Sequence, residues 1–139
     1  MAALSYIFSD SALTTPVDDT TGLTAAAVTG DSIDGVFYVG LTDASNQIQA
    51  QSDPGVDQIT ISISDSDGAS GAAASEIKLA LSNGALGSAT GGASLDIGAT
   101  IAGGSANAVE VHWRWTNAAG SGDYTDLSLD VPALVESAI

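Results

Sequence analysis

The sequence predicts an all-β domain, an antiparallel β-sandwich of either jelly-roll or immunoglobulin-like topology, with extended N-terminal and C-terminal segments. Two observations predict this fold class. Apolar residues recur at every second position in several short runs, which is the period of a half-buried strand. Turn-forming glycine, proline, asparagine and aspartate residues separate these runs at short intervals, as they do in sandwiches and barrels.

Five runs carry the apolar pattern along the chain. Residues 36–41 are apolar at almost every position, which is typical of a strand that is covered on both faces. Residues 59–64 and 77–81 place isoleucine or leucine on one face and mainly small or polar residues on the other. Residues 109–116 alternate most strictly, with two valines and two tryptophans on the inward face. Residues 127–131 repeat the pattern, and together these runs predict the core strands.

The chain is expected to divide into three parts. Residues 1–34 would form an N-terminal arm or long loop with a short apolar strand, residues 35–130 the sandwich, and residues 131–139 a C-terminal strand or inter-subunit tail. Chain ends are usually polar and frayed, but both ends are apolar here. They would be either ordinary edge strands of the same domain or segments that dock onto a neighbouring subunit. The residues expected to make such contacts are Leu4, Tyr6, Ile7, Phe8, Val131, Leu134, Val135 and Ile139.

Composition narrows the possible classes of protein. With 139 residues, 45% of them hydrophobic, the chain is long enough to bury one core. The absence of cysteine removes disulfides, thiolate metal sites and cysteine nucleophiles. No apolar run approaches the roughly 18 residues of a membrane span, and the N-terminus lacks the features of a secretory signal. We therefore expect a soluble protein that is made in a cytoplasm.

The charge balance excludes some partners. Lys and Arg total 2 and Asp and Glu total 17, which gives a formal net charge of −15. Phosphate binding needs clustered cations, so no nucleic-acid partner is expected, and adsorption to an anionic membrane is disfavoured. The negative charge would serve solubility, or it would match a basic partner surface or bound cations.

His112 is the only histidine and therefore the only candidate for a histidine general base. Alternation places it between Glu110 and Arg114 on the polar face of a strand, where a carboxylate could orient it. No Gly-x-Ser-x-Gly nucleophile motif is present, so a cross-strand polar network is the preferred interpretation. No carboxylate pair or phosphate-binding glycine loop stands out either. The sequence therefore predicts no enzymatic activity and no cofactor.

Aspartate-rich turns raise the question of a calcium site. Asp65 and Asp67 lie in a segment whose fifth and sixth positions do not fit an EF-hand loop, and no flanking helices are predicted. A looser site in a β-loop stays open, using Asp65 and Asp67 or the pair Asp53 and Asp57. The alternative is that aspartate and glycine simply form good turns.

The two tryptophans have two interpretations. If Trp113 and Trp115 were exposed, they would form a stacking platform for carbohydrate. Because they continue the apolar face of their strand, placement in the core is the preferred interpretation.

Several short sequence segments of the chain resemble those of the small virion proteins of tailed bacteriophages. They lie at residues 40–46, 52–59, 77–81 and 109–116, and the resemblance spans about residues 36–130. It implies a cysteine-free, non-enzymatic β-sandwich that acts as a capsid decoration (cement) protein. Such proteins are often trimers that sit at three-fold positions of the capsid. Similar modules occur in head fibres, collars and tail appendages.

The resemblance and the apolar ends together lead to one functional expectation. The protein would form a homotrimer on the outer surface of a phage capsid, bind the major capsid protein through its apolar ends, and stabilise the shell. The first alternative is a tail, collar or fibre-associated module with a structural or host-binding role. The second is a carbohydrate-binding β-sandwich that uses the two tryptophans.

Overall fold

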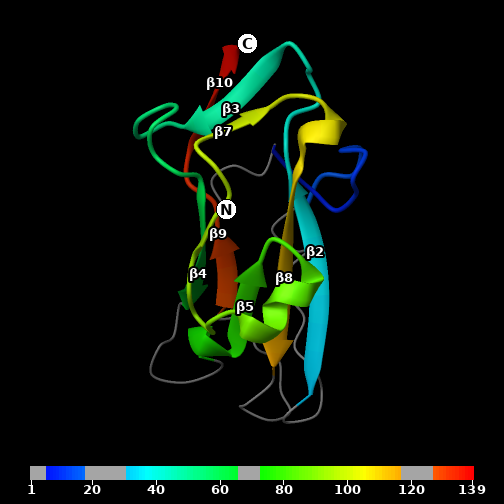
Figure 1. The fold of residues 1–139 in the computed structure, drawn as a ribbon, viewed down its shortest axis with the longest axis vertical. Helices are drawn as coiled ribbons and strands as arrows, with labels where there is room; N and C mark the ends of the chain where they lie inside the picture. Colours follow the sequence, from blue (N-terminus) through cyan, green and yellow to red (C-terminus); the bar gives the residue numbers. More distant parts are fainter. Residues whose placement is uncertain (1–5, 18–30, 66–72, 117–126) are drawn as a thin grey trace.

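The computed structural model describes residues 6–17, 31–65, 73–116 and 127–139, and they form an all-β antiparallel fold (Figure 1). The strands in these residues are β1 (Ile7–Phe8), β2 (Ser32–Val39), β3 (Asn46–Ala50), β4 (Thr60–Asp65), β5 (Ile77–Ala80), β6 (Leu95–Asp96), β7 (Thr100–Ala102), β8 (Val109–Thr116), β9 (Leu127–Asp130) and β10 (Leu134–Ala138). The described helices are three short 3-10 turns, namely η2 (Ala74–Glu76), η3 (Asn83–Ser88) and η4 (Ser105–Asn107). The predicted fold class is confirmed.

One layer is a four-stranded sheet in the order β1-β2-β8-β5. Strands β2 and β8 pair along their whole length, from Ser32 opposite Thr116 to Val39 opposite Val109. Strand β2 begins at Ser32, so the strand starts a little before the expected boundary between residues 34 and 35. Figure 1 shows these two long strands running side by side down the molecule.

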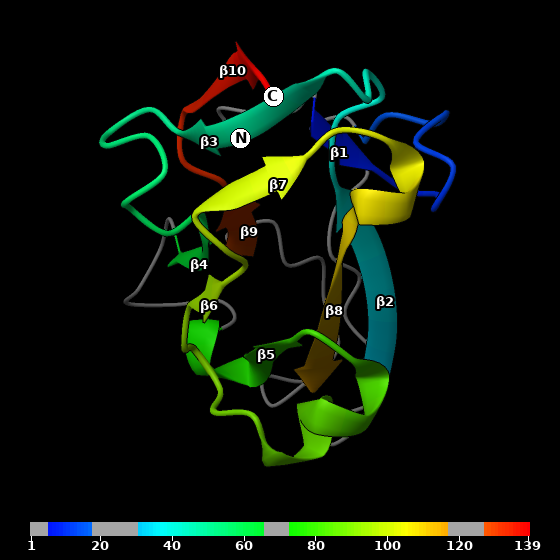
Figure 2. The same ribbon diagram turned by 45° about the horizontal axis from the view of Figure 1, so that its top comes forward.

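The second layer consists of two three-stranded sheets built from the same three segments of chain, residues 46–65, 95–102 and 127–138. One sheet has the order β10-β3-β7 and the other the order β6-β4-β9. The exposed loop 51–58 separates them in the central segment. Gln51 N donates to Ala133 O at 2.9 Å on one side of this loop, and Ile59 N donates to Gly98 O at 2.8 Å on the other. Figure 2 shows β3, β7 and β10 at one end of the layer, with β4 and β6 below them.

The strand order distinguishes this sandwich from the immunoglobulin arrangement. If β3 and β4 count as one strand, and likewise β6 with β7 and β9 with β10, the described chain has seven strands. In this numbering the four-stranded sheet β1-β2-β8-β5 holds the first, second, sixth and fourth strands. In the immunoglobulin domain the fifth strand takes the place of the sixth in this sheet. Periodicity within a run could not reveal this order, because it depends on which distant runs become neighbours.

A single core lies between the two layers. It joins Phe37, Val39 and Val111 of the four-stranded sheet to the inward side chains of the second layer. The buried residues contributed by the second layer are Ile48, Ala50, Ile59, Ile61, Ile97, Ile101, Leu127, Leu129 and Val131. The alternation predicted for 109–116 and 127–131 therefore matches inward burial in both runs.

Two runs depart from their predicted pattern. Leu81 is 53% exposed, because β5 ends at Ala80 and the chain turns away into η3. Ala80 is buried although it lies on the outer face, opposite His112. Val36 is 36% exposed, so the run 36–41 is not covered on both faces at this position. Phe37, Val39 and Leu41 of that run are buried on the inner face, and Tyr38 on the outer face is half-buried.

The described part of the N-terminal segment folds against the domain. Val17 N donates to Ile7 O at 3.0 Å, so the chain doubles back after β1. Asp10 closes the turn by accepting hydrogen bonds from Thr14 N at 3.0 Å and from Thr15 N at 2.8 Å. Leu13 has a φ of 58° and is buried. Residues 6–17 thus form a short apolar strand followed by a turn that packs on the domain, and most of the remaining residues of the expected 1–34 segment lie outside the described ranges.

Candidate functional site

The apolar residues expected to contact other subunits fall into two groups in the structure. Ile7, Phe8 and Val131 are buried within this chain. They correspond to the alternative in which the ends are ordinary strands of the same domain. Tyr6 is partly buried and packs against the core, and its backbone oxygen accepts from Gly40 N at 2.9 Å. Leu4 lies outside the described residues.

The C-terminal residues are more accessible. Leu134 and Val135 are half-buried in β10, while the rest of this strand is exposed. Ile139, directly after β10, is 71% exposed and its N–H donates to Ser45 O at 3.0 Å. Among the predicted residues that the structure describes, this C-terminal group presents the most surface, and Figure 1 places β10 at one end of the molecule.

Strand β10 is paired on one side only. Its partner is β3, in a register that runs from Leu134 opposite Ala50 to Ala138 opposite Asn46. In the part of the chain that the structure describes, no strand pairs with the other side of β10. An unpaired strand edge presents free backbone donors and acceptors, and an extended segment of another chain can add to the sheet there. We define this feature as the β10 edge, residues 134–138.

The outer face of the four-stranded sheet gathers the basic residues of the chain. Lys78 lies opposite Arg114 across β5 and β8, and His112 lies two residues before Arg114 on the same face. Since the sequence holds only two Lys and Arg residues and one histidine, all three basic side chains lie on this one face. The rest of the surface is left to acidic and neutral groups.

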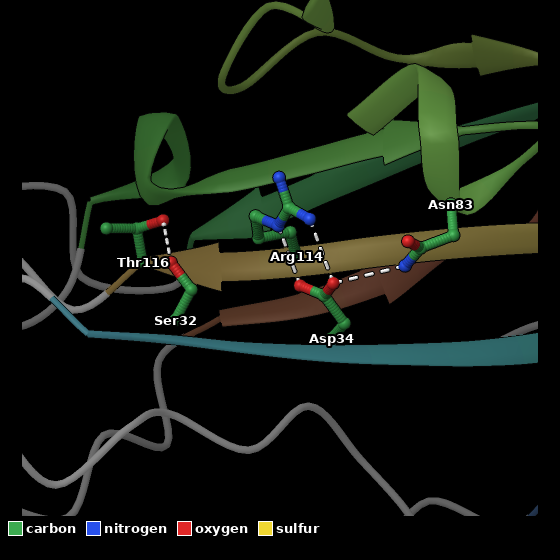
Figure 3. Close-up of polar contacts among 5 residues, drawn as sticks. All are labelled: Ser32, Asp34, Asn83, Arg114 and Thr116. Atoms are coloured by element: carbon green, nitrogen blue, oxygen red, sulfur yellow. Dashed lines mark hydrogen bonds and ion pairs between the residues drawn. The ribbon is translucent and has the colours of Figure 1, made fainter. Parts of the chain in front are cut away.

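Arg114 is neutralised by Asp34 rather than left to bind a ligand. The guanidinium donates from Nε to Asp34 Oδ1 at 2.7 Å and from its second terminal nitrogen to Oδ2 at 2.9 Å, and Asn83 Nδ2 donates to the same Oδ2 at 3.1 Å (Figure 3). The hydrogen bond from Arg114 is the main cause that lowers the pKa of Asp34. The same hydrogen bond raises the pKa of Arg114. Such a two-pronged pair fixes the geometry of both side chains.

The bond to Asn83 also holds η3 over this face of the sheet. Ser82 begins the turn, and its hydroxyl accepts a hydrogen bond from Ala85 N at 3.3 Å. Leu86 of η3 is fully buried, although it lies outside the main core. The turn η3 therefore packs on the outer face of the four-stranded sheet, where it covers Ala80 and part of the strands β5 and β8.

His112 has a carboxylate neighbour but apolar partners across the strands. Its Nε2 lies 3.0 Å from Glu110 Oε2, as the alternation indicated. The residues paired with it are Val36 on β2 and Ala80 on β5. A general base needs a reacting hydroxyl within hydrogen-bond reach, and these paired positions carry none. The polar contact of His112 therefore runs along its own strand, and the cross-strand polar pair on this face is that of Arg114 with Asp34.

The tryptophans pack inward, and Trp115 is nearly fully buried at 1% exposure. Its Nε1 donates to Glu76 Oε1 at 3.3 Å, which satisfies the buried indole. Trp113 is half-buried and packs against the core opposite Gly35. Trp115 is therefore not available to stack on a carbohydrate, and the preferred core placement is confirmed for it.

Three of the four aspartates considered for a calcium site, Asp53, Asp57 and Asp65, lie among the described residues. Asp67 lies outside the described residues, and Asp65 is the last residue of β4. In the exposed loop 51–58, Asp57 N donates to Asp53 O, and the carboxylate of Asp57 accepts from Ser52 Oγ at 2.7 Å. These bonds are those of an ordinary turn. Within the described ranges, no three His, Asp or Glu side chains are grouped as a metal site would need.

Sequence reasoning missed Asp34 and Asn83. A weak signal existed for Asp34, because it sits one alternation step before the apolar run 36–41 and shares the polar face of its strand. Asn83 carried none beyond its turn-forming Ser-Asn-Gly context. Both lie far from Arg114 in sequence, by 80 residues in the case of Asp34.

No protein-family model, curated protein or solved structure matches this chain. No helix among the described residues is long and apolar enough to cross a bilayer.

Proposed function

We propose that the protein is a non-enzymatic structural protein of a tailed-phage virion that binds the outer surface of the capsid and stabilises it. The observation that carries the proposal is the β10 edge, a partly exposed strand with no partner strand on one side among the described residues, followed by the exposed Ile139. A protein that reinforces a shell needs a rigid domain with a surface that can bond to its neighbours. Strand addition at an edge supplies many directional main-chain hydrogen bonds at once.

The polar residues on the outer face of the four-stranded sheet favour a binding role over a catalytic one. Arg114 and Asp34 satisfy each other, and the paired neighbours of His112 are apolar. The strongly negative charge of −15 would keep decorated particles dispersed in solution. A basic patch on the shell would attract such a protein and speed its binding.

Binding to heads that were purified without the protein tests the proposal. Co-sedimentation should show saturable binding, and the decorated heads should withstand a higher temperature before they release their contents. Failure to co-sediment over a wide range of salt concentrations would reject the capsid role. Mass measurement in solution tests the expected homotrimer, which would have three times the 13.7 kDa mass of the chain.

A tail, collar or fibre location is the second candidate, and it is favoured by the same edge, because strand addition serves tail assemblies equally well. Immunogold labelling of intact particles separates the two candidates. Label spread over the head supports decoration, and label confined to the tail or collar replaces it.

A further inference from the structure

Strand β10 is the longest described strand that has a neighbour on one side only. It has five residues, whereas the other edge strands β1, β5, β6, β7 and β9 have between two and four. A five-residue edge can form a ladder of several hydrogen bonds with an added strand. The question is which kind of strand it accepts.

The hydrogen bonds to β3 show which backbone groups of β10 are free. Ile139 N donates to Ser45 O, and Gln51 N donates to Ala133 O. In an antiparallel pair, the residues that bond to the partner alternate with residues that point away. The backbone groups of residues 133, 135, 137 and 139 therefore face β3. Those of Leu134, Glu136 and Ala138 face outward, and these three positions form the free side of the β10 edge.

The middle position of the free side carries a charge. Glu136 is exposed and lies opposite the buried, apolar Ile48 on β3. It forms no ion pair with any described residue, and the two Lys and Arg residues of the chain, Lys78 and Arg114, lie on β5 and β8 in the other layer. An added strand would thus meet an uncompensated carboxylate at the centre of its binding ladder.

This charge argues against a second copy of the chain as the occupant. In two-fold antiparallel pairing of β10 with itself, the register that uses all three free positions sets Glu136 directly opposite its own copy. A register shifted by two residues, which keeps the outward-facing backbone groups paired, still leaves the two Glu136 residues as diagonal neighbours, about 7–8 Å apart between their backbone positions. Each chain also brings a net charge of −15. Like charges at facing positions destabilise a strand pair.

We propose that the β10 edge accepts an extended segment of a different protein that carries lysine or arginine opposite Glu136. The segment bonds through its backbone to the N–H and C=O groups of Leu134, Glu136 and Ala138. Its cation pairs with the carboxylate of Glu136, which both selects the partner and excludes self-association. This inference rests on the proposed function, in which the partner is a component of the virion, and it adds the chemistry by which that partner is recognised.

Two synthetic peptides test the inference without any virion component. Each is a short alternating Thr and Val strand, with lysine at its centre in one and glutamate in the other. Hydrogen exchange followed by NMR reports the amides of β10 one by one. The lysine peptide should slow exchange at Leu134, Glu136 and Ala138, with little change at residues 135 and 137, which already bond to β3. We expect it to bind about fivefold more tightly than the glutamate peptide.

Three variants complete the test. Glu136→Lys should reverse the preference between the two peptides. Ala138→Pro removes a backbone N–H that faces outward, and an edge strand tolerates proline at such a position. This variant should abolish the protection of the β10 amides by the lysine peptide, while its unfolding midpoint stays close to that of the wild type. Ser137→Pro is the matched control, because it removes an N–H that faces β3 and should lower the midpoint. If Ala138→Pro itself unfolds, the charge reversal alone decides the outcome.

The results separate this inference from the function on which it rests. Equal protection by both peptides, no protection by either, or a dimer of the wild-type protein joined through β10 would overturn the inference. Binding to heads that Ala138→Pro leaves unchanged would also overturn it, while the capsid role would stand. Selective binding of the lysine peptide, without any binding to heads, would support the inference and reject the capsid role.

Discussion

The ring of Trp113 occupies the space that a side chain at position 35 would need. Gly35 lies directly opposite Trp113, and a Cβ built at this glycine would fall 2.3 Å from the indole carbon atoms. A glycine inside a strand often marks such a close approach. At residue scale, this one position sets how the half-buried indole packs against the core.

Gly35→Ala should therefore lower the free energy of unfolding by about 1–3 kcal/mol, because the indole must shift to admit the methyl group. Urea unfolding followed by tryptophan fluorescence measures the change. Gly84→Ala is the control, since a Cβ at that glycine has no atom within 4 Å. An equal effect at both positions would mean that the indole does not limit position 35.

Asp34 makes a contribution to stability that depends on pH. Its pKa in the folded protein is lowered, chiefly by the hydrogen bond from Arg114. The contribution is fully present above the unfolded pKa of about 3.9, and it is lost as the pH falls through the lower folded value. Asp34→Asn should therefore lower stability at neutral pH, and the difference from the wild type should shrink below about pH 4.

Urea unfolding across this pH range measures the effect. The control is Asp53→Asn in the exposed loop 51–58, whose side chain makes no hydrogen bond or ion pair with any other described residue. A difference for Asp34→Asn that stays constant down to the lowest pH would show that the carboxylate charge is not what stabilises the pair.

At the scale of elements, strand β8 shows how alternation becomes unequal burial. Trp115 is enclosed between Ile33 on β2 and Ile77 on β5, which are its paired neighbours, whereas Trp113 has Gly35 on one side. The two tryptophans share a face of the strand but not an environment. Their contributions to stability should differ accordingly.

Trp115→Ala should cost about 3–5 kcal/mol of unfolding free energy, as expected for a fully buried aromatic residue. Trp113→Ala should cost less, because part of its ring stays in contact with water in the folded protein. Chemical denaturation monitored by far-ultraviolet circular dichroism measures both variants. A larger loss for Trp113 would contradict the burial described for β8.

At the scale of the whole molecule, the dominant feature is the net charge of −15 on 139 residues. Self-repulsion of this size destabilises a compact state, and salt screens it over a Debye length of about 10 Å at 0.1 M. Screening also weakens the Arg114–Asp34 pair, but this is a single pair with both side chains partly exposed. Repulsion should therefore dominate the salt response.

The melting temperature should rise as NaCl is raised from low to physiological concentration. Differential scanning calorimetry measures it, with sucrose at matched osmolality as the uncharged control. A melting temperature that falls with salt would mean that specific ion pairs outweigh the overall repulsion.

The sequence by itself determined the fold class and the inward faces of individual strands. Val111 and Trp115, and likewise Leu127 and Leu129, were assigned to the core from their period of two, which is a local property of an extended backbone. The contact of His112 with Glu110 was also readable, because the two residues lie two positions apart on the same strand.

Only the tertiary structure decided how these strands meet. The strand order, the burial of Ala80 beneath η3 and the pairing of Asp34 with Arg114 all join segments that are distant in the chain. The same holds for the apolar ends: both form edge strands, but Ile7 and Phe8 of β1 are buried, whereas β10 is largely exposed with Glu136 at its centre. Apolar character alone cannot separate these outcomes, because the burial of an edge strand depends on which distant segments of the chain pack over it.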